Sequence, residues 1–270
     1  MSLSTDEARI PVVFIHGLWV HGESWRPWVE LFRRNGYDAV AAKWPGEADT
    51  PEATRRNGAA MAGYGLSEIA DFITGQLSLF DEKPVLIGHS FGGVLVQNLL
   101  GRGLGAAGVA IDSAPFKGVS ELPLPMVRST RPVLRNPLNY KRVVALTEPQ
   151  FRTGFASAVS EREAKELYSR YAIPGPAKPL FQTITAPLAP NAALKVDTRN
   201  SKRGPLLLMA GSADHTVPPV MVKGALRAYR KTRAITDFKE FPNRGHSLIM
   251  DHGWKELAEY TLNWLHAKGF

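Results

Sequence analysis

The segment 85–93 constrains the fold of this chain more than any other. An apolar run at 85–87 meets the pentapeptide Gly88-His89-Ser90-Phe91-Gly92, and a helix-like run at 94–100 follows at once. So sharp a turn leaves no room for side chains beside its centre, which accounts for the glycines at both ends of the pentapeptide. The pattern therefore predicts a strand, a tight turn and a helix, with the Ser90 hydroxyl pushed out at the carboxyl end of the strand, as in a nucleophile elbow.

Apolar strand-like runs and amphipathic helical runs alternate along most of the chain. This alternation indicates an α/β fold: a mostly parallel sheet of about six strands with right-handed crossovers and helices on both faces. The expected strands are 11–15, 37–42, 85–88, 108–111, 206–210 and 234–241. The expected helices are 24–34, with Ser24 as its N-cap, 66–80, 91–102, 221–230 and 254–268.

Residues 116–200 break the alternation. They contain ten prolines and two capping-box candidates, Thr147-Glu148-Pro149-Gln150 and Ser160-Glu161-Arg162-Glu163, the second opening a helix to about residue 170. Long insertions at the carboxyl edge of a parallel sheet usually cover a site. We therefore expect 1–115 and 201–270 to form one α/β core, with 116–200 as a helical cap insertion after the fourth strand.

Composition narrows the class of protein. The 270 residues, 44% of them apolar, suffice for one large core, and no apolar run is long enough to span a membrane. The segment Met1–Arg9 has no apolar stretch that could serve as a secretory signal, so we expect a cytoplasmic protein. The absence of cysteine excludes disulfides, thiolate metal sites and a cysteine nucleophile.

The net charge of +8 does not by itself indicate a nucleic-acid partner. The basic residues are scattered, and their densest group, 227–233, lies at the end of an expected helix, where cations are favoured. No zinc spacing or aromatic–basic platform accompanies them. We expect neither a nucleic-acid partner nor a bound metal or cofactor, and the sequence leaves monomer and homodimer open.

Four motifs together make the chain resemble the α/β-hydrolase family. They are His16-Gly17-Leu18-Trp19 after the first strand, the elbow at Ser90, Gly211-Ser212-Ala213-Asp214 after the fifth strand, and Gly245-His246-Ser247 after the sixth. The order Ser, Asp, His is the order of that family. The resemblance covers residues 10–115 and 204–268 and is weaker over the insertion.

The resemblance implies a catalytic role for each motif. A serine hydroxyl needs an adjacent base, so His246 would accept the proton of Ser90, and Asp214 would hold the imidazole in the correct tautomer. Two backbone N–H groups, of Leu18 and Phe91, would bind the oxyanion of the tetrahedral intermediate. Asp112 is a rival acid, because it follows the fourth strand and some hydrolases take their acid from that place.

Several further residues are assigned supporting roles. His16 adjoins the glycine of the oxyanion loop and would order that loop, whereas His89 would pack within the elbow. An apolar pocket with few polar groups is the usual form of a small-molecule site. We expect Trp19, Trp44, Val217 and Leu248 to contact the substrate because they lie near the ends of strands or beside the acid and the histidine.

These residues predict a cofactor-independent serine hydrolase acting on a small apolar carboxylic ester, with thioesters as an alternative. The same triad also supports carbon–carbon hydrolysis, perhydrolysis or cyanohydrin cleavage, because a fold does not fix a reaction. A serine at position 90 argues against relatives that use an aspartate nucleophile. A ligand-binding, receptor-like homologue is the remaining alternative from another class.

Overall fold

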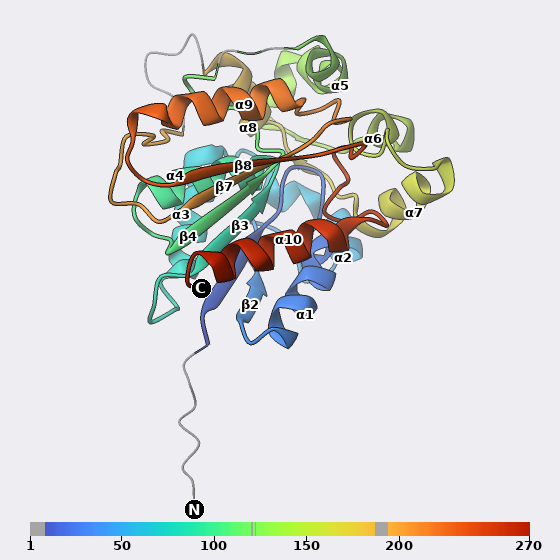
Figure 1. Ribbon diagram of the computed structural model, residues 1–270. Helices are drawn as coiled ribbons and strands as arrows, with labels where there is room; N and C mark the ends of the chain where they lie inside the picture. The colour runs from blue at the N-terminus through green and yellow to red at the C-terminus, as the bar shows by residue number, and fades with distance from the viewer. Residues whose placement is uncertain (1–8, 120, 122, 187–193) are drawn as a thin grey trace, which may run out of the picture.

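A six-stranded parallel sheet forms the centre of the molecule (Figure 1). The computed structural model describes residues 9–119, 121, 123–186 and 194–270. In sheet order the strands are β2 (Asp38–Ala41), β1 (Pro11–Ile15), β3 (Val85–His89), β4 (Ala107–Ile111), β7 (Leu206–Gly211) and β8 (Thr236–Phe241). The predicted fold class is thus confirmed, and every predicted strand end lies within two residues of the observed one.

The residue pattern of each strand matches its position in the sheet. Strands β1, β3, β4 and β7 are buried over their whole length and consist almost entirely of apolar residues and glycine. Such continuous apolar runs are typical of parallel strands covered on both faces. At one edge, β8 carries the mixed sequence TDFKEF and is only partly buried up to its last residue.

Helices cover both faces of the sheet, as the alternation predicts. On one face, α1 (Arg26–Arg34) and α10 (Trp254–Ala267) meet through a ring contact between Trp28 and Trp254, while Trp28 also packs on Phe14 of β1. The other face is covered by α3 (Leu66–Leu77), α4 (Phe91–Gly101) and α9 (Pro219–Ala228), followed by η4 (Tyr229–Lys231). A hydrogen bond from the Tyr229 hydroxyl to Gln97 joins η4 to α4.

The start of the first helix corrects the prediction that Ser24 is its N-cap. A 3₁₀ turn, η1 (Gly22–Trp25), precedes α1, and the ring of His21 caps that turn by accepting the N–H of Glu23. The Ser24 hydroxyl is buried and has no hydrogen-bond partner among the described residues. The imidazole thus takes the capping role three residues earlier, because His21 is fixed there by other contacts.

The sequence pattern did not predict two short elements after β2. They are α2 (Pro51–Arg56) and η2 (Gly58–Met61). The signal for the first was present, since Thr50 accepts the N–H of Ala53 and Pro51 occupies the first helical position. A helix of six residues is too short to show an apolar period, which is why the pattern alone missed it.

Between β4 and β7 the chain forms a separate group of helices on the carboxyl side of the sheet (Figure 1). The elements are α5 (Leu124–Leu134), η3 (Pro137–Lys141), α6 (Glu148–Gly154), α7 (Glu161–Tyr171) and α8 (Lys178–Thr185), with an antiparallel pair of β5 (Val143–Val144) and β6 (Gly175–Pro176). Thr147 and Gln150 form the first predicted capping box. Ser160 caps α7, but the second predicted box is not completed, because the Glu163 side chain contacts His252 instead. The predicted insertion includes residues 120, 122 and 187–193, and the predicted N-terminal segment includes 1–8; these lie outside the described residues.

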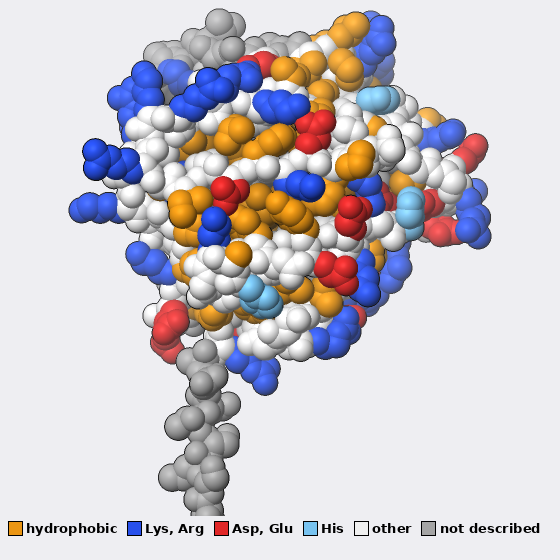
Figure 2. Space-filling view, viewed as in Figure 1, with side chains coloured by type: hydrophobic (Ala, Val, Ile, Leu, Met, Phe, Trp, Pro, Cys, Tyr) orange, Lys and Arg blue, Asp and Glu red, His pale blue; other side chains and the backbone are white. Residues whose placement is uncertain are grey.

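The surface in Figure 2 carries lysine and arginine mainly around its periphery, with acidic side chains between those nearer the centre. Within the described ranges, no helix combines the length and the apolar character needed to cross a bilayer. The cytoplasmic location and the absence of a nucleic-acid partner stay predictions.

Candidate active site

The turn between β3 and α4 holds Ser90 in a strained conformation. Its φ of 55° and ψ of −118° are rare for a residue with a side chain. Two backbone bonds fix the turn to β4 and the segment after it, from Ser90 N–H to the Ile111 carbonyl and from Ala114 N–H to the Ser90 carbonyl, both 2.9 Å. A Cβ atom at Gly92 would lie 2.0 Å from the Ile15 carbonyl oxygen, so the chain needs glycine there to approach β1.

His246 and Asp214 form a buried pair at the same edge of the sheet. Asp214 follows β7 and His246 follows β8, and their atoms Oδ2 and Nδ1 are 2.6 Å apart. The other carboxylate oxygen accepts the N–H groups of Thr216 and Val217 at 2.6 and 2.8 Å. Burial alone would raise the pKa of Asp214, but the contact with His246 lowers it below its ordinary value. The carboxylate is therefore ionised, and Nδ1 of His246 is the donor.

The second nitrogen of His246 is left available. Its Nε2 atom is buried without a hydrogen-bond partner among the described residues. His89 is the neighbour of Ser90, and the centroid of its ring lies 4.5 Å from the centroid of the His246 ring. The elbow and the loop that carries His246 are therefore in contact. Burial and the nearby His246 hold the pKa of His89 well below its ordinary value, so His89 is a neutral packing group.

Asp112 is the second carboxyl group beside His246. It follows β4 with a φ of 40°, and its Oδ1 accepts the N–H of Gly211 at 2.8 Å. Its Oδ2 lies 4.0 Å from Nδ1 of His246, compared with 2.6 Å for Asp214. Burial and the negative charge of Asp214 raise the pKa of Asp112 well above its ordinary value, which favours the protonated form of this carboxyl group.

His89, Asp112 and His246 also make up a group of possible metal ligands within the described residues. Two ligands of one tetrahedral zinc lie about 3.4 Å apart, given bonds of about 2.0–2.1 Å. The 4.0 Å separation of Asp112 and His246 is wider, and the same nitrogen of His246 already donates to Asp214. Nδ1 of His246 is therefore a hydrogen-bond donor to Asp214 and not a metal ligand in this arrangement.

The loop after β1 reaches the elbow from the other side. A Cβ atom on Gly17 would lie 2.8 Å from Cβ of Ser90 and 3.4 Å from the backbone nitrogen of Phe91, so only glycine permits this approach. Among the described residues, the backbone N–H groups of Leu18 and Phe91 meet no acceptor. Phe91 follows Ser90 directly and Leu18 follows Gly17, so the two predicted oxyanion donors belong to the two segments that meet at Ser90.

The insertion is hydrogen-bonded to this loop. The N–H of Ile173 donates to the Trp19 carbonyl, and the N–H of His21 donates to the Tyr171 carbonyl, both at 3.0 Å. The indole N–H of Trp19 donates to the Val144 carbonyl at 3.0 Å. Segments that are more than 100 residues apart in the sequence therefore form one structure around the loop after β1.

The residues predicted to contact the substrate are all buried. Trp19 has a φ of 64° and bonds to the insertion, and Val217 donates its N–H to Asp214. The ring of Trp44 is stacked on His16 with centroids 5.0 Å apart, while Leu248 lies two residues after His246 and is completely buried. Two of the four thus support the loop and the acid directly.

Phe155 was missed by the sequence reasoning. Its ring stands edge-on to the His246 ring with centroids 4.8 Å apart, and it stacks on Phe151 at 5.0 Å. The spacing of four residues between the two phenylalanines indicated a shared helix face. Nothing in that spacing indicated that the face would meet His246, which depends on how the insertion folds back.

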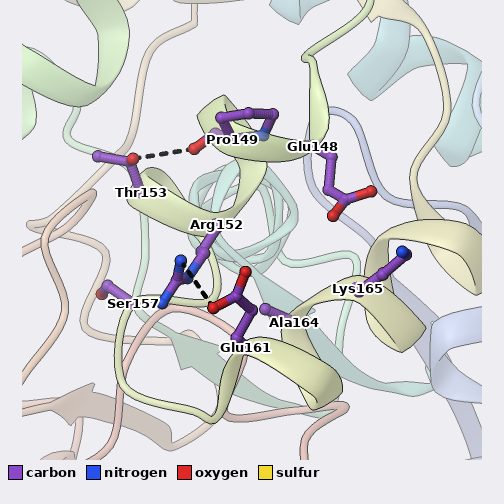
Figure 3. A pocket seen from close by; sticks show the side chains of 8 residues that line it. All are labelled: Glu148, Pro149, Arg152, Thr153, Ser157, Glu161, Ala164 and Lys165. Atoms are coloured by element: carbon purple, nitrogen blue, oxygen red, sulfur yellow. Dashed lines mark hydrogen bonds and ion pairs between the residues drawn. The ribbon is translucent and has the colours of Figure 1, made fainter.

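A cavity of about 360 Å³ lies between α6 and α7, away from these residues (Figure 3). Its charged lining is balanced, with Glu148 and Glu161 facing Arg152 and Lys165, and Arg152 pairs with Glu161 at 3.6 Å. Neither Ser90 nor His246 lines it. The cavity is therefore a surface feature of the insertion and separate from the candidate active site.

The fold and the site together define the class of the protein. A model of the alpha/beta hydrolase family matches residues 12–260, and the chain belongs to that family. A search of curated proteins gives no match.

Solved structures share the fold over nearly the whole chain. An extracellular alpha/beta-hydrolase from a Paenibacillus species has a TM-score of 0.68 at 19% identity, covering 94% of this chain and 98% of its own. A monoacylglycerol lipase from Paleococcus ferrophilus has a TM-score of 0.66 at 22% identity, covering 96% and 94%. A methylesterase from Arabidopsis has a TM-score of 0.65 at 14% identity, covering 95% and 99%.

Proposed function

We propose that this protein is a cofactor-independent serine hydrolase that cleaves small apolar carboxylic esters through an acyl-enzyme. The observation that carries the proposal is the buried, 2.6 Å His246–Asp214 pair beside the strained Ser90 turn. Strain of this kind persists where a site requires it. A lipase and a methylesterase among the structural neighbours support ester cleavage as the reaction.

In the acylation step, Oγ of Ser90 attacks the ester carbonyl carbon while Nε2 of His246 takes the hydroxyl proton. The carbonyl oxygen becomes an oxyanion, which the N–H groups of Leu18 and Phe91 stabilise. His246 then gives its proton to the alkoxide, and the alcohol leaves. Asp214, an acceptor at Nδ1, stabilises the imidazolium that forms between these two proton transfers.

In the deacylation step, water replaces the alcohol. His246 removes one proton from the water, whose oxygen attacks the acyl carbon of Ser90, and the second oxyanion occupies the same donor pair. Collapse breaks the bond to Oγ, which recovers its proton from His246, and the carboxylic acid leaves. Helix α4 begins at Phe91, and the positive end of its dipole stabilises both oxyanions.

The substrate must reach a covered serine. Ser90 is only 3% exposed, and the insertion is bonded to the adjacent loop. We therefore assign residues 116–200 as a cap whose segments frame the acyl or alcohol group. The aromatic wall of Trp19 and Phe155, with centroids 6.3 Å apart, suits an apolar group.

The direct test is hydrolysis of short p-nitrophenyl esters by the wild type and by Ser90→Ala. We expect the variant to lose about 10⁴-fold or more in kcat, as serine hydrolases do when the nucleophile is removed. Ser113→Ala is the matched control, because Ser113 is also buried at a strand end but bonds to Gln97. Equal activity of wild type and Ser90→Ala would contradict the proposal.

A substrate panel separates ester cleavage from the alternatives. It contains esters, thioesters, β-diketones and cyanohydrins, with a fluorophosphonate probe to label the nucleophile. We expect the esters to be turned over fastest and Ser90 to be labelled. Strong diketone cleavage with little ester turnover would favour carbon–carbon hydrolysis, and an unlabelled Ser90 in folded protein would favour a ligand-binding role.

A further inference from the structure

A second buried histidine–carboxylate pair lies at the end of β1, outside the proposed triad. Nε2 of His16 is 2.7 Å from Oε2 of Glu47, and Nδ1 of His16 is 2.9 Å from the carbonyl oxygen of Gly17. His16 is 1% and Glu47 9% exposed. The ring of Trp44 stacks on the imidazole and completes its enclosure.

The partners of Glu47 favour its ionised form, because the carboxyl group is surrounded by backbone N–H groups and a histidine ring that can all donate. Its Oε1 accepts the N–H of Gly22, and its Oε2 accepts the N–H of Trp44, both at 2.9 Å. An ionised carboxylate only accepts hydrogen bonds, so Nε2 of His16 must donate to it. A carbonyl oxygen also only accepts, so Nδ1 must donate to Gly17. With protons on both ring nitrogens, His16 is an imidazolium.

The neighbouring His21 does not share this charge. Its Nδ1 accepts the N–H of Glu23 and therefore carries no proton, while its Nε2 donates to the Ala48 carbonyl at 3.1 Å. Burial lowers the pKa of His21, although the carboxylate of Glu47 lies 3.2 Å from it. The buried cluster thus holds one cation, His16, and one anion, Glu47.

The bond to Gly17 acts on a particular peptide group. The carbonyl of Gly17 and the N–H of Leu18 belong to one planar, trans peptide, so they point in opposite directions. Fixing the Gly17 oxygen on the His16 ring therefore directs the Leu18 N–H away from that ring. The same peptide begins at Gly17, whose Cα lies against the Ser90 side chain.

We infer that the His16 imidazolium, anchored by Glu47, is a positioning device that holds the Leu18 N–H in place for the oxyanion. The inference rests on the proposed function of Ser90 and adds Glu47, a residue of the loop between β2 and α2, to the groups on which the reaction depends. From the opposite side, the insertion holds the same loop through Ile173 and Tyr171. The position of this donor matters because stabilisation of the oxyanion supplies a large share of the rate enhancement in acyl transfer.

The electrostatics of the cluster agree with this geometry. Burial by itself would lower the pKa of His16, but the charge and hydrogen bond of Glu47, with the Gly17 and Val20 carbonyls, raise it above its ordinary value. Burial likewise opposes ionisation of Glu47, yet the contacts with His16, His21 and Gly22 lower its pKa to about 2. His89 and His21 face the ring as neutral groups.

The first experiment measures the charge of His16 directly. Histidine ring nitrogens labelled with ¹⁵N are followed by NMR in the full chain, with His16 assigned by its loss in His16→Gln. In the wild type we expect both nitrogens to be protonated below pH 6.5 and the ring to titrate above 6.5. In Glu47→Gln, if folded, the midpoint should fall below 6.5. A His16 that is already neutral below pH 6.5 in the wild type would overturn the inference, whether or not the protein hydrolyses esters.

The second experiment compares binding of a trifluoromethyl ketone, whose adduct with serine is an oxyanion, in wild type and Glu47→Gln. We expect the variant to bind this ketone about 10- to 100-fold more weakly and to lose a similar factor in kcat, with KM changed less than about twofold. Glu163→Gln is the matched control, because it breaks an exposed pair with His252. The inference would be overturned if Glu47→Gln raised KM by the same factor by which it lowered kcat and left the affinity for the ketone unchanged. Failure of the wild type to bind the ketone would instead contradict the proposed function.

Discussion

Two histidine–carboxylate pairs at the carboxyl edge of one sheet have opposite chemistry. His246 with Asp214 and His16 with Glu47 are both buried, and their hydrogen bonds are 2.6 and 2.7 Å long. In the first pair the other ring nitrogen, Nε2, has no partner among the described residues. In the second pair the other nitrogen donates to the Gly17 carbonyl.

The partner of the second nitrogen decides what each ring can do. A histidine with a carboxylate on one side and an open nitrogen on the other can take up a proton and release it, which is what a general base requires. A histidine with acceptors on both sides is locked as a cation and can only hold geometry. A nearby carboxylate therefore does not identify a catalytic histidine.

The largest expected effect distinguishes the two rings. His246→Gln should lower kcat on p-nitrophenyl esters by about 10⁴-fold or more, because it removes the base. His16→Gln should cost about 10- to 100-fold, because a donor is displaced and the base remains. The measurement is steady-state kinetics with circular dichroism to verify folding. Equal losses in both variants would show that the difference between the pairs has no catalytic meaning.

The next effect concerns the two acids beside His246. Asp214→Asn should lower kcat by about 10²- to 10⁴-fold, because an amide favours the wrong tautomer. Asp112→Asn should change kcat by less than about tenfold, because asparagine resembles the protonated carboxyl group that is already there.

The double variant, which combines Asp112→Asn with Asp214→Asn, tests whether Asp112 can partly replace Asp214. With Asp214 neutral, Asp112 at 4.0 Å can ionise and orient the ring, so the double variant should be at least about tenfold slower than Asp214→Asn alone. Single-turnover rates for the three variants provide this comparison. Additive losses would mean that Asp112 acts independently of the triad.

The smallest expected effect is the way in which the contribution of the His16–Glu47 pair to the free energy of unfolding depends on pH. Glu47, with its pKa lowered from 4.5 to about 2, stabilises the fold above pH 4.5 and loses this effect as the pH falls towards 2. His16, with a raised pKa, stabilises below pH 6.5 and loses the effect as the pH rises through its folded value. The pair therefore contributes most between about pH 4.5 and 6.5.

Urea unfolding of wild type and Glu47→Gln at several pH values tests this window. The difference in free energy of unfolding should reach about 3–5 kcal/mol between about pH 4.5 and 6.5 and shrink on both sides, because breaking a buried pair leaves one charge unpaired. Glu163→Gln, which breaks an exposed pair, should change stability by less than about 1 kcal/mol. A difference that does not vary with pH would indicate lost packing only.

The sequence predicted the sheet well because its strands carry their own signal. Continuous apolar runs such as 206–210 have few alternatives to a buried strand. Gly88 and Gly92 stand where two backbone segments approach so closely that any side chain would prevent the contact. The short α2 and the His21 cap were missed, since both depend on contacts with distant segments. The contacts of Phe155 with His246 and of Glu47 with His16 were not predicted for the same reason.

The sequence by itself determined the fold family, the positions of the strands along the chain and the identity of Ser90, Asp214 and His246 as candidates. Each follows from local pattern: an apolar run, a glycine turn and a polar residue at a strand end. Only the tertiary structure decided which carboxylate meets which histidine, and on which nitrogen. Those contacts join residues 31 and 32 positions apart, and a hydrogen bond of 2.6 or 2.7 Å depends on how whole loops pack, which no local pattern encodes.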